Sequence, residues 1–149
     1  DALRHGWSPS SREDTSREVL AALEADPDDW LARFLAVDPD IDSRRWFIWD
    51  GSFAGTVSLR WVPGVDRLPA RISGHVGYNV VPWRRGRGYA SKALALVMAR
   101  APDLTGLDAL EITTAPGNPA SQRVIEKNGG YLIGPKGDRF VFKLPLDAR

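Results

Sequence analysis

The chain has 149 residues, of which 43% are hydrophobic and 26% charged, with a formal net charge of +1. This length suits one globular domain over residues 1–149, although the first residue is not Met and the natural start is left open. The absence of cysteine excludes a thiolate zinc site, an iron–sulfur cluster and an acyl-cysteine relay. No apolar run approaches the ~20 residues that span a bilayer, so we expect no membrane partner and a cytoplasmic location.

Charge is unevenly distributed along the chain. Residues 1–50 contain twelve Asp or Glu and six Arg, whereas residues 51–149 contain seven acidic and fourteen basic side chains. The asymmetry suggests that the second part meets an anion, although helix caps in the first part and chance in the second would give the same sums.

Two helices are expected at the start of the chain. Ser10 and Glu13 have the spacing of a capping box, and apolar residues at helical spacing follow, which predicts a helix over residues 11–25. Asp26 before a proline is typical of an N-cap, and the second, short helix should end before Pro39.

Aromatic and β-branched residues then replace the helical pattern. Residues 45–50 and 53–62 are predicted to be antiparallel strands, because the Asp50-Gly51 pair between them is a hairpin signal. A loop with two prolines follows, and residues 72–81 are predicted to form a third strand.

Helices and strands alternate in the rest of the chain. The expected elements are a buried helix from Tyr89 that stops at Pro102, a strand over 107–114, a helix opened by Asn118-Pro119 and closed by Gly129-Gly130, and strands over 131–134 and 139–144. The order ααβββαβαββ predicts an α/β (α+β) fold with a mixed sheet flanked by helices.

The strongest motif lies between the third strand and the central helix. It reads Pro82-Trp83-Arg84-Arg85-Gly86-Arg87-Gly88-Tyr89-Ala90. Two glycines one residue apart let successive backbone N–H groups point into one concavity, and the following helix adds its own free N–H groups. With the arginines, this loop is suited to a phosphate or pyrophosphate.

Familiar alternatives fit this loop poorly. The chain lacks the Gly-Lys-Ser/Thr triplet of a nucleoside-triphosphate loop. A dinucleotide-binding loop needs glycine or alanine where Ser91 stands, although Glu111 could act as its ribose-binding acid and keeps that interpretation open. Trp83 and the arginines could contact nucleic acid, but one short basic cluster is weak support, and we expect no nucleic-acid partner.

A third sequence motif matches this loop better. Arg85-Gly86-Arg87-Gly88-Tyr89-Ala90 matches the Arg/Gln-x-x-Gly-x-Gly/Ala loop, and here the chain resembles the GNAT family of acetyl-CoA-dependent N-acetyltransferases. The stretch from Asn118 to Gly129 resembles the family's second motif, an Asn-x-x-Ala/Ser helix ending in Lys-x-Gly. The resemblance covers about residues 10–143, is closest to the branch that acetylates ribosomal proteins or protein N-termini, and implies a mostly antiparallel sheet.

The resemblance implies acetyl-CoA as the acetyl donor, with no metal. Coenzyme A would lie along the strand before the loop and on the N–H groups of the loop. The implied binding residues are Val80, Val81, Arg85, Gly86, Arg87, Gly88, Tyr89, Ala90, Asn118 and Ser121. Asn118 and Ser121 also have structural interpretations, as an N-cap and a solvated residue of the first helical turn.

The implied reaction is direct transfer of an acetyl group to a primary amine of a small molecule or peptide, with the Val81 N–H as oxyanion donor. Many family members carry an acid tyrosine where Ile125 stands here, which leaves water or Tyr131 as the acid. His75 is the expected base and Glu111 the second candidate, although a buried strand histidine and a solvent-facing glutamate would look the same.

Two sets of residues bear on the acceptor that would receive the acetyl group. Four tryptophans fall in elements that shape the acceptor pocket in this family, although most are expected in the core: Trp30, Trp46, Trp49 and Trp61. Six aspartates would attract a cationic amine unless they only cap helices: Asp26, Asp28, Asp29, Asp38, Asp40 and Asp42. The competing hypothesis is a non-catalytic acyl-CoA-binding regulatory module, and a homodimer is left open.

Overall fold

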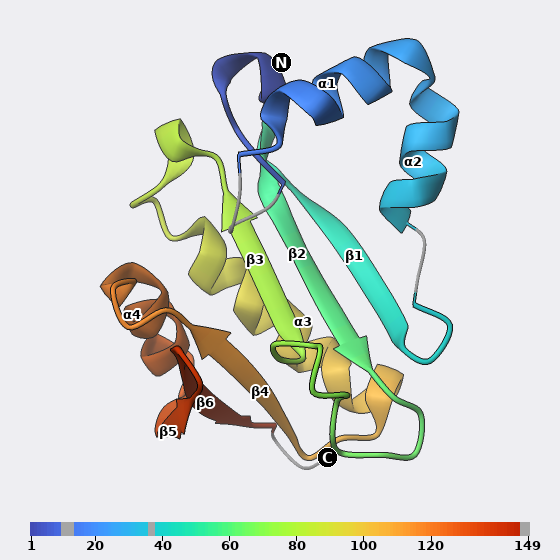
Figure 1. The fold of residues 1–149 in the computed structure, drawn as a ribbon. Coiled ribbons are helices and arrows are strands. Elements are labelled where there is room, and N and C mark those ends of the chain that lie inside the picture. Colours follow the sequence, from blue (N-terminus) through green and yellow to red (C-terminus); the bar gives the residue numbers. More distant parts are fainter. Residues whose placement is uncertain (10–13, 36–37, 147–149) are drawn as a thin grey trace.

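The computed structural model describes residues 1–9, 14–35 and 38–146. Within them the elements follow in the order shown in Figure 1: η1 (Leu3–His5), α1 (Ser16–Ala25), α2 (Pro27–Leu35), β1 (Asp42–Trp49), β2 (Phe53–Trp61), β3 (Val76–Val80), η2 (Pro82–Arg84), α3 (Tyr89–Thr105), β4 (Ala109–Thr114), α4 (Pro119–Lys127), β5 (Tyr131–Lys136) and β6 (Arg139–Pro145). The predicted fold class is confirmed, since helices flank antiparallel strands in the predicted order. No helix among the described residues is long and apolar enough to cross a membrane.

The strands form two three-stranded antiparallel sheets. In the first, β2 lies between β1 and β3, and in the second, β6 lies between β4 and β5. An isolated bridge between Gly74 and Ile112 joins the two sheets. From there β3 and β4 diverge toward the end of the molecule where η2 and α4 begin (Figure 1). Among the described residues, the outer edge of β3 therefore has no strand partner beyond this bridge.

The two faces of the first sheet differ in their surroundings. Val57, Leu59 and Trp61 of β2 are buried in one hydrophobic cluster with Leu94 of α3, which lies behind the sheet in Figure 1. Because side chains alternate along a strand, the intervening residues point to the opposite face, toward α1 and α2. These residues are polar: Thr56, Ser58 and Arg60. The sequence thus builds a polar sheet face next to the first two helices.

The ends of several elements differ from the predictions. Ser10 and Glu13, the predicted capping box, lie outside the described residues, and α1 begins at Ser16. Pro102 does not stop α3, which continues to Thr105. In the turn after the proline, which itself lacks an N–H, the Thr105 hydroxyl donates to the Ala101 carbonyl at 2.7 Å.

The third strand is shorter than predicted. Residues 72–75 precede β3, and there the chain turns to meet β4. A Cβ on Gly74 would lie 3.0 Å from the Glu111 carbonyl oxygen, and the His75 N–H donates to that same oxygen at 2.7 Å. The close approach to β4 removes these residues from the regular ladder with β2.

Candidate active site

Two cavities meet where β3 diverges from β4. The larger, of about 920 Å³, lies between the loop after β3, the start of α3 and α4, and we call it the loop cavity. The smaller, of about 580 Å³, lies between α1, α2 and the polar face of the first sheet, and we call it the sheet cavity. Four residues line both cavities, and they mark the junction: Tyr78, Asn79, Asn118 and Ser121.

The loop curls as its two glycines predict. Gly86 and Gly88 have left-handed φ values of 74° and 81°, and a Cβ on either would meet no atom within 4 Å. Their conformation therefore serves the backbone path and not a steric need. The N–H groups of Tyr89, Ala90 and Ser91 fall in the first turn of α3, where they lack partners within the helix, and all three residues line the loop cavity. This arrangement fits an anion.

The three arginines of the loop differ in position. Arg85 lines the loop cavity, and its Nε donates to the Val80 carbonyl at 3.0 Å. Arg84 also lines this cavity, but one of its guanidinium nitrogens donates to the Tyr89 hydroxyl at 3.1 Å. Arg87 is exposed and is not among the residues that line either cavity. Arg85 is thus the arginine best placed to meet a bound phosphate.

The backbone of β3 corrects one prediction. The Val81 N–H, expected as the oxyanion donor, donates to the Ala54 carbonyl at 3.0 Å, and Val81 is fully buried. Because backbone N–H groups alternate in direction along a strand, the Val80 N–H points the other way, toward the edge of β3 that faces the gap. Val80 lines the loop cavity.

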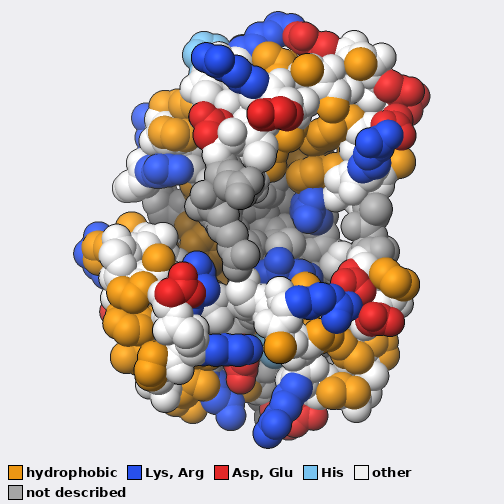
Figure 2. All heavy atoms as spheres, in the orientation of Figure 1, with side chains coloured by type: hydrophobic (Ala, Val, Ile, Leu, Met, Phe, Trp, Pro, Cys, Tyr) orange, Lys and Arg blue, Asp and Glu red, His pale blue; other side chains and the backbone are white. Residues whose placement is uncertain are grey.

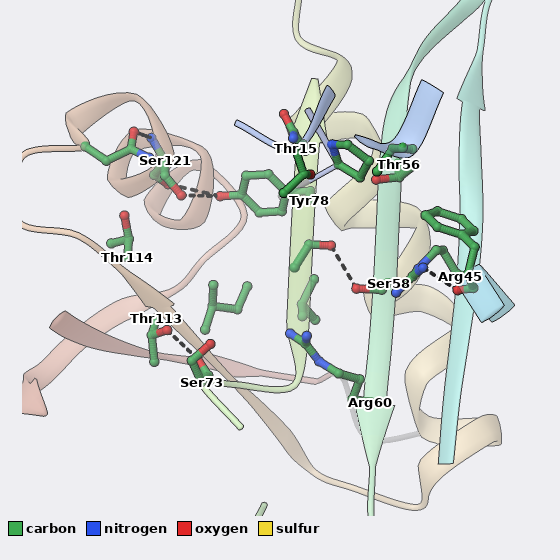
Figure 3. A pocket seen from close by; sticks show the side chains of 18 of the residues that line it. Thr15, Arg45, Thr56, Ser58, Arg60, Ser73, Tyr78, Thr113, Thr114 and Ser121 are labelled. Atoms are coloured by element: carbon green, nitrogen blue, oxygen red, sulfur yellow. Dashed lines mark hydrogen bonds between the residues drawn. The ribbon is translucent and has the colours of Figure 1, made fainter. Parts of the chain in front are cut away.

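Tyr78 is the residue that the sequence interpretation missed. Its hydroxyl lies 2.7 Å from the Ser121 Oγ at the junction of the cavities (Figure 3). Burial raises the pKa of Tyr78 more than the Ser121 hydrogen bond lowers it, so the phenol stays protonated at neutral pH. The structure confirms Asn118 as the N-cap of α4, because its Oδ1 accepts from the Ser121 N–H at 3.1 Å. The position of Tyr78 on the strand that enters the loop was the available signal.

The two predicted bases lie outside both cavities. His75 is buried, and its Nδ1 accepts from the Glu111 N–H at 2.9 Å, so the neutral ring carries its proton on Nε2. Burial also lowers the pKa of His75. Glu111 is exposed on β4. Neither residue lines a cavity, so this geometry gives His75 a structural role at the strand junction and leaves both catalytic roles as predictions.

The positions considered for the acid also lie elsewhere. Ile125, where many family members have a tyrosine, is fully buried in the core. Its neighbour Val124 lines the loop cavity instead. Tyr131 on β5 is 51% exposed and lines neither cavity.

The aspartates of the first part do not line the sheet cavity in the described part of the chain. Asp26 caps α2, because its Oδ1 accepts from the N–H groups of Asp28 and Asp29 at 3.1 and 2.9 Å. Asp38 pairs with Arg71 at 2.8 Å. Asp26 thus serves as a cap and Asp38 as an ion-pair partner, and the attraction of a cationic amine by the six aspartates stays a prediction.

The tryptophans divide between the core and the sheet cavity. Trp61 is buried and Trp46 packs against the core, whereas Trp49 is 69% exposed. Trp30 alone of the four lines the sheet cavity, stacked on Phe34 with ring centroids 4.8 Å apart. The described residues contain no group of three or more side chains placed to hold a metal ion.

A family model described as an acetyltransferase (GNAT) domain matches residues 5–130. The chain therefore belongs to the GNAT acetyltransferase family. It is 32% identical over 92 residues to the L-2,4-diaminobutyric acid acetyltransferase of Streptomyces avermitilis, a match that covers 55% of this chain and 51% of that protein. The chain thus spans about half the length of this curated relative.

Solved structures share the fold. An acetyltransferase from Agrobacterium tumefaciens superposes with a TM-score of 0.55 at 19% identity, over 88% of this chain and 71% of that one. A chimera of the Vibrio cholerae spermidine N-acetyltransferase superposes with a TM-score of 0.57 at 16% identity, over 81% of this chain and 76% of that one. A putative ribosomal-protein-serine acetyltransferase from Vibrio cholerae superposes with a TM-score of 0.57 at 16% identity, over 88% of this chain and 75% of that one.

Proposed function

We propose that this chain transfers an acetyl group from acetyl-CoA directly to a primary amine of a small molecule or peptide. The observation that carries the proposal is the junction of the two cavities at Tyr78, Asn79, Asn118 and Ser121. A donor in the loop cavity and an acceptor in the sheet cavity would meet there. Direct transfer suits a chain without cysteine, because no protein thiol is present to carry the acetyl group.

The loop cavity supplies what coenzyme A needs. The N–H groups from Gly86 to Ala90, at a helix N-terminus, would hold the diphosphate, with Arg85 adding its charge. The unpaired edge of β3 would bond the amide groups of the pantetheine arm, in the manner of an added strand. Asn118 and Ser121 line the path from the loop to the junction.

In the transfer, a bond forms between the amine nitrogen and the acetyl carbon, and the bond from that carbon to sulfur breaks. The thioester supplies an activated acetyl carbon when it is bound. The Val80 N–H, on the edge of β3 that faces the gap, would donate to the negative charge that develops on the acetyl oxygen. Tyr78, protonated at neutral pH, would give its proton to the leaving sulfur. Because His75 and Glu111 line neither cavity, we assign removal of the ammonium proton to water at the sheet cavity.

The curated relative favours a small acceptor. It is named for diaminobutyric acid, a small amine, whereas the structural neighbours are divided between spermidine and a ribosomal protein. The sheet cavity, at about 580 Å³, has the volume of a small-molecule site.

A thiol-reactive dye tests the proposal, because a protein without cysteine gives no background. Release of coenzyme A with any member of a panel of amines and peptides supports transfer. Tight binding of acetyl-CoA with no release across the panel would favour the non-catalytic acyl-CoA-binding module.

We also propose that the homodimer left open by the sequence forms through β5. This strand lies at an edge of the second sheet. Three successive residues on it, Tyr131, Leu132 and Ile133, are each about half exposed. Exposed apolar edge strands are prone to pair with another chain, and a second copy supplies the same edge. Light scattering of the wild type and of Leu132→Lys tests this, with a loss of dimer expected in the variant and a wild-type monomer contradicting it.

A further inference from the structure

The sheet cavity contains an arginine without a counter-charge. Arg60 extends from β2 across to β3, where its Nη2 would lie 3.2 Å from a Cβ placed on Gly77 (Figure 3). The Nε of Arg60 is buried and has no hydrogen-bond partner in the described part of the chain. No ion pair between Arg60 and a described carboxylate is present either.

Three further arginines line this cavity, but each is already engaged. Arg45 donates to the Phe34 carbonyl at 2.5 Å, and its guanidinium carbon lies 4.1 Å from the centre of the Phe34 ring. Arg139 donates two hydrogen bonds, of 3.0 and 3.1 Å, to a threonine of β4. Arg33 pairs with Asp29 at 2.8 Å. Arg60 is therefore the one among the described arginines of the cavity whose guanidinium is left for a ligand.

The charged side chains in the described lining of this cavity are all positive. Its described lining contains these four arginines, two asparagines, and hydroxyl-bearing and apolar residues, and no Asp or Glu. Figure 2 shows blue Lys and Arg side chains within the hollow at the centre of this face. Burial and the nearby charge of Arg45 both oppose the charge of Arg60, which a guanidinium nevertheless keeps. A half-buried, unpaired cation is costly, and an anion bound there would offset that cost.

The position of Arg60 relates this charge to the reaction. Its guanidinium lies beside Gly77, the residue that precedes Tyr78 at the junction of the cavities. An anion on Arg60 would therefore lie close to an amine that reaches the junction, within the span of one small molecule. A polyamine in the same place would set its second ammonium group against the arginines.

We infer that the acceptor is a small amine that also carries a carboxylate, and that Arg60 binds this carboxylate in the sheet cavity. The inference rests on the proposed transfer reaction, for which it names the substrate class. A planar guanidinium can bond both oxygens of a carboxylate, which sets the orientation of the acceptor as well as its affinity.

Binding to the protein saturated with coenzyme A tests the inference without turnover. The probes are matched pairs that differ only in the carboxylate: lysine against cadaverine, and ornithine against putrescine. Calorimetry should show at least one amino acid of these pairs binding tenfold or more tightly than its diamine. In Arg60→Met this preference should disappear, while Arg60→Lys should keep part of it.

Arg33→Met is the matched control, because Arg33 lines the same cavity but is exposed and ion-paired. It should keep the preference. Arg60→Met should fold at least as stably as the wild type, since it removes an unpaired cation and keeps an apolar stem, and thermal unfolding checks this. Equal or tighter binding of the diamines, no binding of either amino acid, or an unchanged preference in folded Arg60→Met would overturn the inference. Amino acids that bind without coenzyme A release would instead count against the transfer reaction.

Discussion

The Tyr78 hydroxyl and the Ser121 Oγ lie 2.7 Å apart although 43 positions separate them in the chain. This hydrogen bond connects β3 to the first turn of α4 across the place where the two sheets separate. It therefore holds together the two elements that frame the junction of the loop cavity and the sheet cavity. The residues at which donor and acceptor would meet are thus also ones that connect β3 to α4 at the junction.

Tyr78→Phe separates the chemical from the structural role of this bond. Loss of the acid should lower kcat by roughly a hundredfold, the smaller end of the effect of a general acid, and change the alkaline side of the pH–rate profile. The free energy of unfolding should fall by only about 1 kcal/mol, the value of one hydrogen bond. Ser121→Ala is the control, since it breaks the same bond but keeps the phenol. Equal losses of kcat in both variants would show that Tyr78 only positions α4.

Gly88→Ala tests the left-handed cap of α3. An alanine at φ 81° costs roughly 1–2 kcal/mol, and the N–H groups of the loop should move from their common direction, so we expect about tenfold weaker coenzyme A binding. Gly137→Ala is a matched control, because Gly137 has φ 60° in the turn between β5 and β6, away from both cavities. It should lower thermal stability similarly and leave affinity intact. Equal affinities in the two variants would remove the loop as the diphosphate site.

Arg85 and Arg87 provide a paired test of charge in the loop. Arg85 lines the loop cavity and Arg87 does not. Arg85→Gln should weaken coenzyme A binding by about tenfold at low salt, as expected for a charge-assisted hydrogen bond, and less at high salt. Arg87→Gln should change the affinity less than threefold. A reversed order, measured by calorimetry at two ionic strengths, would contradict this placement.

His75 predicts a pH dependence of stability. Burial depresses its pKa in the folded state below the ordinary value of about 6.5. The unfolded chain therefore binds more protons below that pH, and the free energy of unfolding should fall as the pH drops from 7 toward 5. His75→Gln should lose this part of the pH dependence, whereas replacement of the exposed His5 should not. The same variant tests catalysis, because an altered pH–rate profile near neutrality would restore His75 as the base.

Local patterns predicted most of the elements and the curled backbone of the glycine loop. The glycine spacing of 86 and 88 sets a backbone path that depends little on the rest of the molecule. The N-cap at Asn118 is also a local property, since its side chain bonds a residue only three positions later. Features of this kind can be read from neighbouring residues.

The site residues that were missed depend on contacts between distant segments. The Tyr78 hydroxyl bonds α4, and Arg60 faces a cavity because residues of α1 and α2 form another of its walls. The Val81 N–H could be excluded only once the pairing of β3 with β2 was known. His75 is expected as the base from its chemistry at neutral pH, whereas its bond to the Glu111 N–H, which sets the tautomer of its ring, joins residues 36 positions apart.

The most direct test of the account is a crystal structure of the protein with acetyl-CoA. We predict the diphosphate on the backbone N–H groups from Gly86 to Ala90 and the thioester at the junction beside Tyr78. A donor bound with its diphosphate elsewhere, or a loop cavity closed by its own side chains in the presence of saturating donor, would contradict the account.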